Sequence, residues 1–277
     1  MTNLTDWIGR ATELNCWLDP WRAQALHATL DSTDAVPDAG AALSPGWHWA
    51  YFLDTAPSSE LGPDGHPRRG TFMPPVPLPR RMWAGSRLEF LAPIALGTPA
   101  RRVSRILAVE EKNGRSGRLC CVTVGHEIHG EHGVAIREQQ DIVYRDVVAG
   151  GGAPPSQSAP PDARWQREWH FDSPRLFRYS AITFNSHRIH YDREYVTKEE
   201  GYPGLVVHGP LLATLMLELV GVQVPQRPLL RFEFRAIAPV FDGQVIHACG
   251  KPDGDCVELW IRGGSGALHM RGNVVLG

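Results

Sequence analysis

The chain lacks the features that mark several large classes of protein. Its five cysteines are an odd number and include no CxxC pair, so neither a disulfide framework nor a zinc ribbon is expected, and a reducing compartment is favoured. The longest apolar runs, such as 211–217, are far shorter than the roughly 20 residues of a membrane span. No basic segment followed by an apolar stretch opens the sequence, so we expect a cytoplasmic protein without a membrane partner.

An excess of charge of one sign is also missing. The 28 basic and 30 acidic residues leave a net charge of -2, which provides no basic domain for binding nucleic acid. The HExxH, P-loop, GxGxxG and GxSxG motifs are absent, so zinc peptidase, nucleotide-binding and serine hydrolase chemistry lack their usual signatures. Core residues are plentiful: hydrophobic side chains make up 43% of the 277 residues, which predicts a folded globular protein.

The composition changes sharply at 148–163, which reads VAGGGAPPSQSAPPDA. Gly, Pro, Ala and Ser dominate there, and such a stretch cannot bury enough apolar surface to fold by itself. We therefore predict a linker over 147–164, between an N-terminal domain over 1–146 and a C-terminal domain over 165–277.

The first half is predicted to begin with a helix over 5–31, because Trp21, Ala25 and Leu30 have helical spacing. A proline-rich surface loop is expected around 55–80. Strand-like runs follow at 86–94, 100–112, 117–130 and 133–146. The sequence NGRSG, at 113–117, is typical of a hairpin turn between two of these runs.

The second half contains a helix over 210–222 that is apolar on nearly every side. A helix that is apolar all round is buried all round. Strand-like runs lie at 167–172, 228–240, 244–253, 256–263 and 267–276. The periodicity of the two halves thus predicts an α+β fold with antiparallel sheet and two similar halves.

One segment carries a recognisable motif. Residues 185–192 read NSHRIHYD, and VHG follows at 207–209 as the apolar helix begins. This resembles the MaoC-like hydratase and dehydratase superfamily, whose signature is Asp-x-Asn-Pro-(apolar)-His-x-Asp followed by His-Gly at the start of a buried helix. The resemblance implies two tandem hotdog domains, each a curved antiparallel sheet around a central helix, which together form a double hotdog.

Longer strings favour one branch of that superfamily. YSAITFNSHRIHYDREY in the second half, and WHWAYF, LPRRMWAGSRLEF and EQQDIVYRD in the first, are similar to type 2 hydroxyacyl-thioester dehydratases and mesaconyl-C4-CoA (3-methylfumaryl-CoA) hydratases. The resemblance implies a hydro-lyase that adds water to an α,β-unsaturated acyl-CoA, with mesaconyl-C4-CoA giving citramalyl-CoA as the first choice. It also implies that the first half is non-catalytic and completes the acyl and CoA pocket, and that CoA enters only as part of the substrate, with no other cofactor.

Several alternatives remain open at this point. Within the same chemistry they are a 3-hydroxyacyl-thioester dehydratase of fatty acyl chains and an itaconyl-CoA-type hydratase. Outside it they are an acyl-CoA thioesterase and a non-catalytic acyl-CoA-binding protein. The oligomeric state is also open, and a homo-oligomer is compatible with the sequence.

Hydration of an enoyl thioester needs a base toward water, an acid toward Cα and donors that hold the thioester oxygen. His190 is the candidate base and acid, because imidazole titrates near neutral pH. Gly209 is the candidate donor, because it opens a helix and its N–H has no acceptor within that helix. Both positions match the functional residues of the family.

The chain departs from the family where the signature has its acid. Five residues before His190 stands Asn185, and an amide cannot accept a proton at any useful pH. We expect Asn185 to orient the water or to stabilise the transition state through hydrogen bonds, and His190 to carry out both proton transfers on one face of the double bond. His187, which stands where the family has Asn, is the alternative second acid–base group.

Arginine is the natural partner of a substrate carboxylate or a CoA phosphate through paired hydrogen bonds. The candidates for substrate binding are Arg81, Arg188, Arg231 and Arg235, together with Trp83 as a pocket wall. The closely spaced His126, His129 and His132 resemble a set of metal ligands, but on a strand the first two side chains face opposite sides of the sheet. We therefore predict no metal site.

Overall fold

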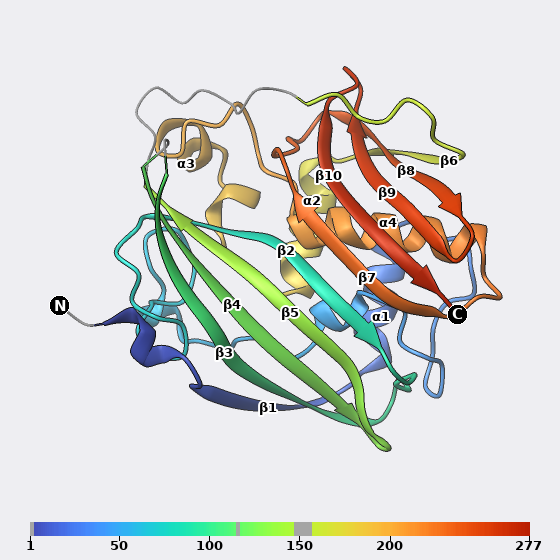
Figure 1. Cartoon of the computed structure of the whole chain (residues 1–277), viewed down its shortest axis with the longest axis horizontal. Coiled ribbons are helices and arrows are strands. Elements are labelled where there is room, and N and C mark those ends of the chain that lie inside the picture. The colour runs from blue at the N-terminus through green and yellow to red at the C-terminus, as the bar shows by residue number, and fades with distance from the viewer. Residues whose placement is uncertain (1–2, 115–116, 147–156) are drawn as a thin grey trace.

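A single antiparallel sheet of ten strands runs through the molecule (Figure 1). It is seen in a computed structural model that describes residues 3–114, 117–146 and 157–277. The strand order is β1-β3-β4-β5-β2-β7-β10-β9-β8-β6. The strands are β1 (Ala11–Trp17), β2 (Arg80–Phe90), β3 (Pro99–Gly114), β4 (Gly117–Gly130), β5 (Gly133–Arg145), β6 (Trp165–His170), β7 (Leu229–Ala236), β8 (Val245–Asp253), β9 (Cys256–Gly263) and β10 (Leu268–Leu276).

The two halves of the chain repeat one strand order. Read outward from the centre, the first half runs β2-β5-β4-β3-β1 and the second runs β7-β10-β9-β8-β6. The halves meet where β2 pairs with β7, from Gly85 opposite Arg235 to Glu89 opposite Arg231. This repetition is what two tandem hotdog domains require. The division into domains at 147–164 stays a prediction, because residues 147–156 of that segment lie outside the described part of the chain.

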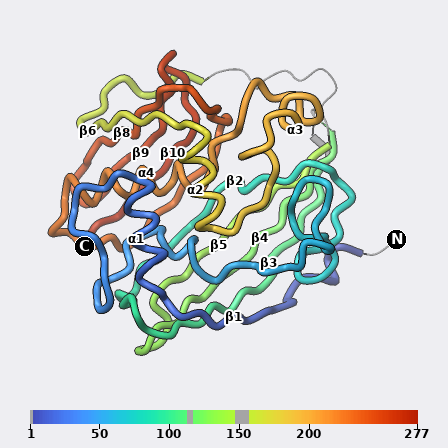
Figure 2. The backbone as a smooth tube through the Cα atoms, turned by 180° about the vertical axis from the view of Figure 1, so that it is seen from behind, coloured from blue at the N-terminus to red at the C-terminus, as the bar shows by residue number. Residues whose placement is uncertain are grey.

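In the described residues, four α-helices accompany the sheet: α1 (Pro20–Thr29), α2 (Ser173–Ile182), α3 (Arg193–Lys198) and α4 (Gly209–Gln223). The view from behind shows α1, α2 and α4 on the same side of the sheet (Figure 2). Helix α4 is the apolar helix of the sequence, and every residue from Leu211 to Leu217 is buried. It packs against β6, β8, β9 and β10, so its all-round apolar surface is matched by all-round burial. Of the described residues, none belongs to a helix that is long and apolar enough to cross a membrane.

The prediction of one helix over 5–31 is correct only for residues 20–29. Residues Leu4–Trp7 form a 3-10 turn, Ala11–Trp17 form the edge strand β1, and the helix begins at Pro20. In β1, half-buried and exposed residues alternate strictly, and each residue is paired with β3. Asp19 caps the helix by accepting a hydrogen bond from the Trp21 amide, and Pro20 at the first position fixes its start.

The proline-rich segment at 55–80 is not simply a surface loop. Val76 and Leu78 are buried in a cluster on the inner face of the first half of the sheet, where Tyr144 also lies. Arg69 donates hydrogen bonds to the carbonyls of Val76, Leu78 and Pro79, which folds the segment back on itself. The same segment also brings residues 63–66 into contact with the motif segment of the second half.

Candidate active site

His190 lies in a short 3-10 turn, Arg188–His190, and its side chain is almost completely buried. Its Nδ1 lies 2.7 Å from the carbonyl oxygen of Val206. A carbonyl can only accept, so Nδ1 carries the ring proton and Nε2 is left with a free lone pair. Burial lowers the pKa of His190 to about 4, so the ring is neutral and able to accept a proton at physiological pH.

The next imidazole along the site belongs to His208. Its ring stacks on that of His190 with 3.7 Å between centroids, and its Nε2 lies 2.8 Å from the Ser180 hydroxyl of α2. His208 is fully buried and is the N-cap residue of α4, so the following residue, Gly209, opens the helix beside the two rings. The Gly209 N–H is therefore a first-turn donor at the positive end of the helix dipole, as the sequence predicted.

Gly209 leaves room for a ligand. A Cβ built on this residue would meet only the backbone oxygen of Trp83, at 3.9 Å, and the backbone does not adopt a positive φ here. Neither strain nor packing within the protein therefore demands glycine. The open space beside a free donor is what a thioester oxygen needs.

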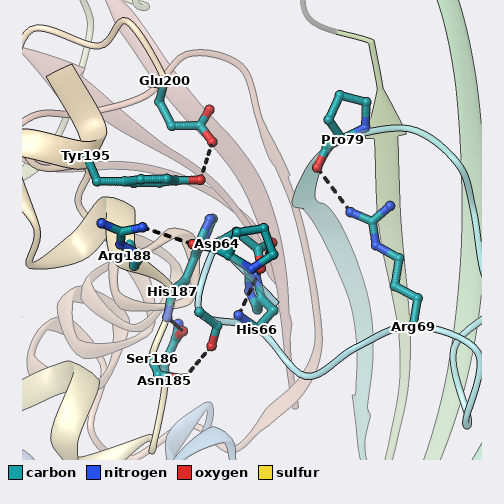
Figure 3. Close-up of polar contacts among 12 residues, drawn as sticks. Asp64, His66, Arg69, Pro79, Asn185, Ser186, His187, Arg188, Tyr195 and Glu200 are labelled. Atoms are coloured by element: carbon teal, nitrogen blue, oxygen red, sulfur yellow. Dashed lines mark hydrogen bonds and ion pairs between the residues drawn. The ribbon is translucent and has the colours of Figure 1, made fainter. Parts of the chain in front are cut away.

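Asn185 is held by the local backbone. Its Oδ1 accepts a hydrogen bond from the His187 amide at 3.0 Å, which forms an Asx turn (Figure 3). That turn aims His187 inward, where its ring meets His190 edge to face at 5.5 Å between centroids. Burial, together with the neighbouring imidazoles of His66 and His190, lowers the pKa of His187 far below its usual value. The catalytic roles predicted for these two residues stay predictions.

Two residues that the sequence did not single out, Asp64 and His66, join the same cluster (Figure 3). The His66 ring lies 4.0 Å from that of His187, centroid to centroid, and its Nδ1 lies 3.0 Å from Asp64 Oδ2. Burial and the charge of Arg81 lower the pKa of His66 to about 4, although Asp64 opposes the shift. For Asp64, burial would raise the pKa, but the hydrogen bond from His66 lowers it well below its usual range.

Arg81 is the predicted arginine that faces this cluster. In the antiparallel pair β2–β5 it lies opposite the buried Tyr144, so both side chains point to the inner face of the sheet. Its charge helps to lower the pKa of both His66 and His187. Its neighbour Arg80 is paired with Glu200, whereas no carboxylate of the described residues forms an ion pair with Arg81.

The structure does not bring the other predicted arginines to the same place. Arg188 is paired with Asp192 at 2.7 Å and donates to the carbonyl of Pro63, so it fastens the 63–66 segment instead of facing the histidines. Arg231 and Arg235 alternate along β7 with the buried Phe232 and Phe234, and therefore point to the outer face of the sheet. Arg231 lines a hollow of about 460 Å³ on that face, away from the histidine cluster.

Trp83 is half-buried next to Gly209 and belongs to the inner face of β2. Its Nε1 lies 2.9 Å from the Ser86 hydroxyl, which in turn donates to the buried Glu138 at 2.8 Å. Trp49 packs against Trp83 edge to face and donates to the same carboxylate. This network fixes the indole of Trp83 as one wall beside the start of α4.

The histidines around the β4–β5 turn are separated, as predicted. His126 is buried and lies 2.8 Å from the Ser104 hydroxyl, whereas His132 is exposed at the turn. The donor atoms that do converge belong to Asp64, His66 and His187, and they lie within 4.8 Å of one another. The free charge of Arg81 nearby disfavours a cation among them, and the absence of a metal stays a prediction.

Comparisons with known proteins bear on the family and the fold of the chain. A family model for type 2 hydroxyacyl-thioester dehydratases matches residues 46–242, which is well over half of the chain. The chain belongs to this family. As a member, it is 46% identical over 272 residues to mesaconyl-C(4)-CoA hydratase of Chloroflexus aurantiacus, covering 98% of this chain and 97% of that relative. It is 32% identical to the mitochondrial type 2 hydroxyacyl-thioester dehydratase of Schizosaccharomyces pombe, covering 79% of this chain and 80% of that one.

Membership in the family confirms both the resemblance and the hydro-lyase class that the motif indicated. The fold is confirmed independently by solved structures. A MaoC-like dehydratase of Phytophthora capsici superposes with a TM-score of 0.68 at 14% identity, covering 100% of this chain and 99% of that one. A Mycobacterium tuberculosis protein described as having a double hotdog fold superposes with a TM-score of 0.60 at 12% identity, covering 98% and 96%.

Proposed function

We propose that this member of the type 2 hydroxyacyl-thioester dehydratase family hydrates a carboxylate-bearing enoyl-CoA, with mesaconyl-C4-CoA as the substrate and citramalyl-CoA as the product. The proposed reaction rests on one observation: the unprotonated Nε2 of His190 lies beside the N-terminus of α4 at Gly209. A base and an oxyanion donor thus lie within one small site, as addition of water to an activated double bond requires.

The reaction follows from these two groups. His190 Nε2 takes a proton from water as the water oxygen bonds to Cβ, and the π electrons of the double bond move toward the thioester oxygen. The Gly209 N–H holds that oxygen while it carries negative charge. The imidazolium of His190 then gives its proton to Cα, which leaves the ring neutral again. Burial lowers the pKa of His190 to about 4, which weakens Nε2 as a base toward water but makes the imidazolium a better proton donor to the enolate.

The choice of substrate rests on Arg81. A carboxylate at the far end of a short acyl group needs a cationic partner on the inner face, and Arg81 has no carboxylate partner among the described residues. Arginine binds carboxylates through two parallel hydrogen bonds. The identity of 46% to mesaconyl-C(4)-CoA hydratase supports the same assignment. A fatty acyl chain would instead leave this guanidinium facing apolar carbons.

A panel of enoyl-CoA thioesters, with and without a terminal carboxylate, tests the proposal. Hydration is followed by the loss of enoyl absorbance and by the mass of the product. The variant Arg81→Met should raise KM for the carboxylate-bearing substrates by at least about tenfold, since a charge-assisted hydrogen bond is worth about 1.5–3 kcal/mol. It should leave crotonyl-CoA, which lacks the carboxylate, within about twofold.

Arg235→Met is the matched control, because Arg235 lies on the outer face of the adjoining strand. It should change neither class of substrate. Equal loss with both substrate classes in Arg81→Met would contradict the assignment of the carboxylate. Release of free thiol without formation of any hydrated acyl-CoA would identify a thioesterase and refute the hydratase function itself.

A further inference from the structure

The active site lacks one group that the chemistry calls for. Asn185 occupies the position of the family's acid, and its Oδ1 is already engaged by the His187 amide. An amide carries no proton to or from water. His190 therefore has no carboxylate partner from its own segment, in which its one basic neighbour is the imidazole of His187.

The N-terminal half brings a histidine and a carboxylate to this place. The carbonyls of three consecutive residues, 63–65, accept hydrogen bonds from Arg188 and Ser186 of the motif segment. The approach is so close that a Cβ at Gly65 would lie 2.0 Å from the Ser186 carbonyl oxygen, and Gly65 also has a φ of +87°. Only glycine satisfies both conditions, so this close contact between the two segments depends on glycine at position 65.

Within that segment, His66 and Asp64 form a hydrogen-bonded pair. An ionised carboxylate only accepts, so the 3.0 Å contact between His66 Nδ1 and Asp64 Oδ2 places the ring proton on Nδ1. The free lone pair of His66 is then on Nε2, as it is in His190. The rings of His66, His187 and His190 form a continuous row, with centroids 4.0 and 5.5 Å apart. The side chains of His66 and Asp64 are 19% and 21% exposed, so water reaches this end of the row.

We propose that His66 is a further catalytic residue, which accepts a hydrogen bond from the attacking water, and that Asp64 positions it. The inference rests on the proposed hydration. One proton of the water passes to His190 and then to Cα. The other stays on the oxygen as the product hydroxyl and is held by His66 Nε2, so His66 is neutral before and after the reaction. The N-terminal half thereby supplies what Asn185 lacks.

Steady-state hydration by the full-length protein tests the role of His66. His66→Ala should lower kcat by about 10²-fold, which is the usual cost of losing one preorganised hydrogen bond to the reacting atoms, and should change KM by less than about threefold. Added imidazole should restore part of kcat. His132→Gln, a change in the exposed histidine of the β4–β5 turn, is the control and should leave kcat unchanged.

The variant Asp64→Asn distinguishes a role in positioning the ring of His66 from a role in packing the segment. The amide can donate to Nδ1, which moves the ring proton to Nε2 and turns the acceptor toward water into a donor. This variant should therefore lose about as much kcat as His66→Ala, with an unchanged melting temperature, and the double variant should be no worse than either single one.

The possible outcomes are distinguishable. If the wild-type protein hydrates enoyl-CoA and His66→Ala keeps more than half of kcat, the role of His66 is refuted and the proposed function stands. A raised KM with a lowered melting temperature and no rescue by imidazole would show that His66 only secures the segment, which also refutes it. A wild-type protein that hydrates none of the thioesters overturns the proposed function and this inference together.

Discussion

Replacing Gly209 by alanine tests the oxyanion site directly. A methyl group at this position meets only the Trp83 oxygen, at 3.9 Å, and the backbone φ suits any residue, so the fold should tolerate the change. The same methyl group would fill the space beside the N–H in which the thioester oxygen is expected. Displacing that oxygen removes one donor to the developing charge, which costs about 10²–10³-fold in kcat, or about 2.7–4 kcal/mol.

The assay compares Gly209→Ala with Gly221→Ala, a second glycine of the same helix. A Cβ at Gly221 has no atom within 4 Å and lies at the other end of α4. Gly221→Ala should stabilise the protein by about 0.5–1 kcal/mol through helix propensity and leave hydration unchanged. Gly209→Ala should lower kcat for enoyl-CoA by about 10²–10³-fold without lowering the melting temperature. If both variants retain full activity, the thioester oxygen does not bind at the start of α4.

Two further predictions concern the buried histidines. His190→Ala should leave less than about a tenth of the wild-type hydration rate, since acid–base groups typically contribute about 10²–10⁴-fold, and a larger residual rate would exclude His190 as the proton carrier. In the folded state the pKa values of His126 and His190 are lowered to about 4, mainly by burial. The unfolded chain binds these protons near pH 6.5 and the folded chain only near pH 4, so stability is lost as the pH falls through this window. Urea titrations should show a loss of about 1.4 kcal/mol per pH unit for each histidine, with a smaller slope in His126→Gln, and equal stability at pH 6.5 and 5 would contradict the burial argument.

The local elements could largely be predicted from the sequence, because their signals are short-ranged. The strands at 117–130 and 256–263 have the predicted bounds, and the apolar helix at 210–222 differs by one residue at each end. The motif located His190 and Gly209, and its spacing sufficed to indicate the family. Residues 5–31 were misjudged because helical spacing around 21–30 was extended over an edge strand, whose half-buried alternation gives a weak pattern.

The sequence by itself determined the family and the fold class, and its motif located His190 and Gly209, since each of these signals is encoded within a few neighbouring positions. Tertiary structure alone decided which arginine faces the histidines, because the side of a sheet depends on register and on the neighbouring strand. It also decided that Asp64 and His66 lie against the motif, since Gly65 and Ser186, which make that contact, stand 121 positions apart. The free lone pairs on His66 and His190 likewise follow from an acceptor that only the folded chain places beside each ring.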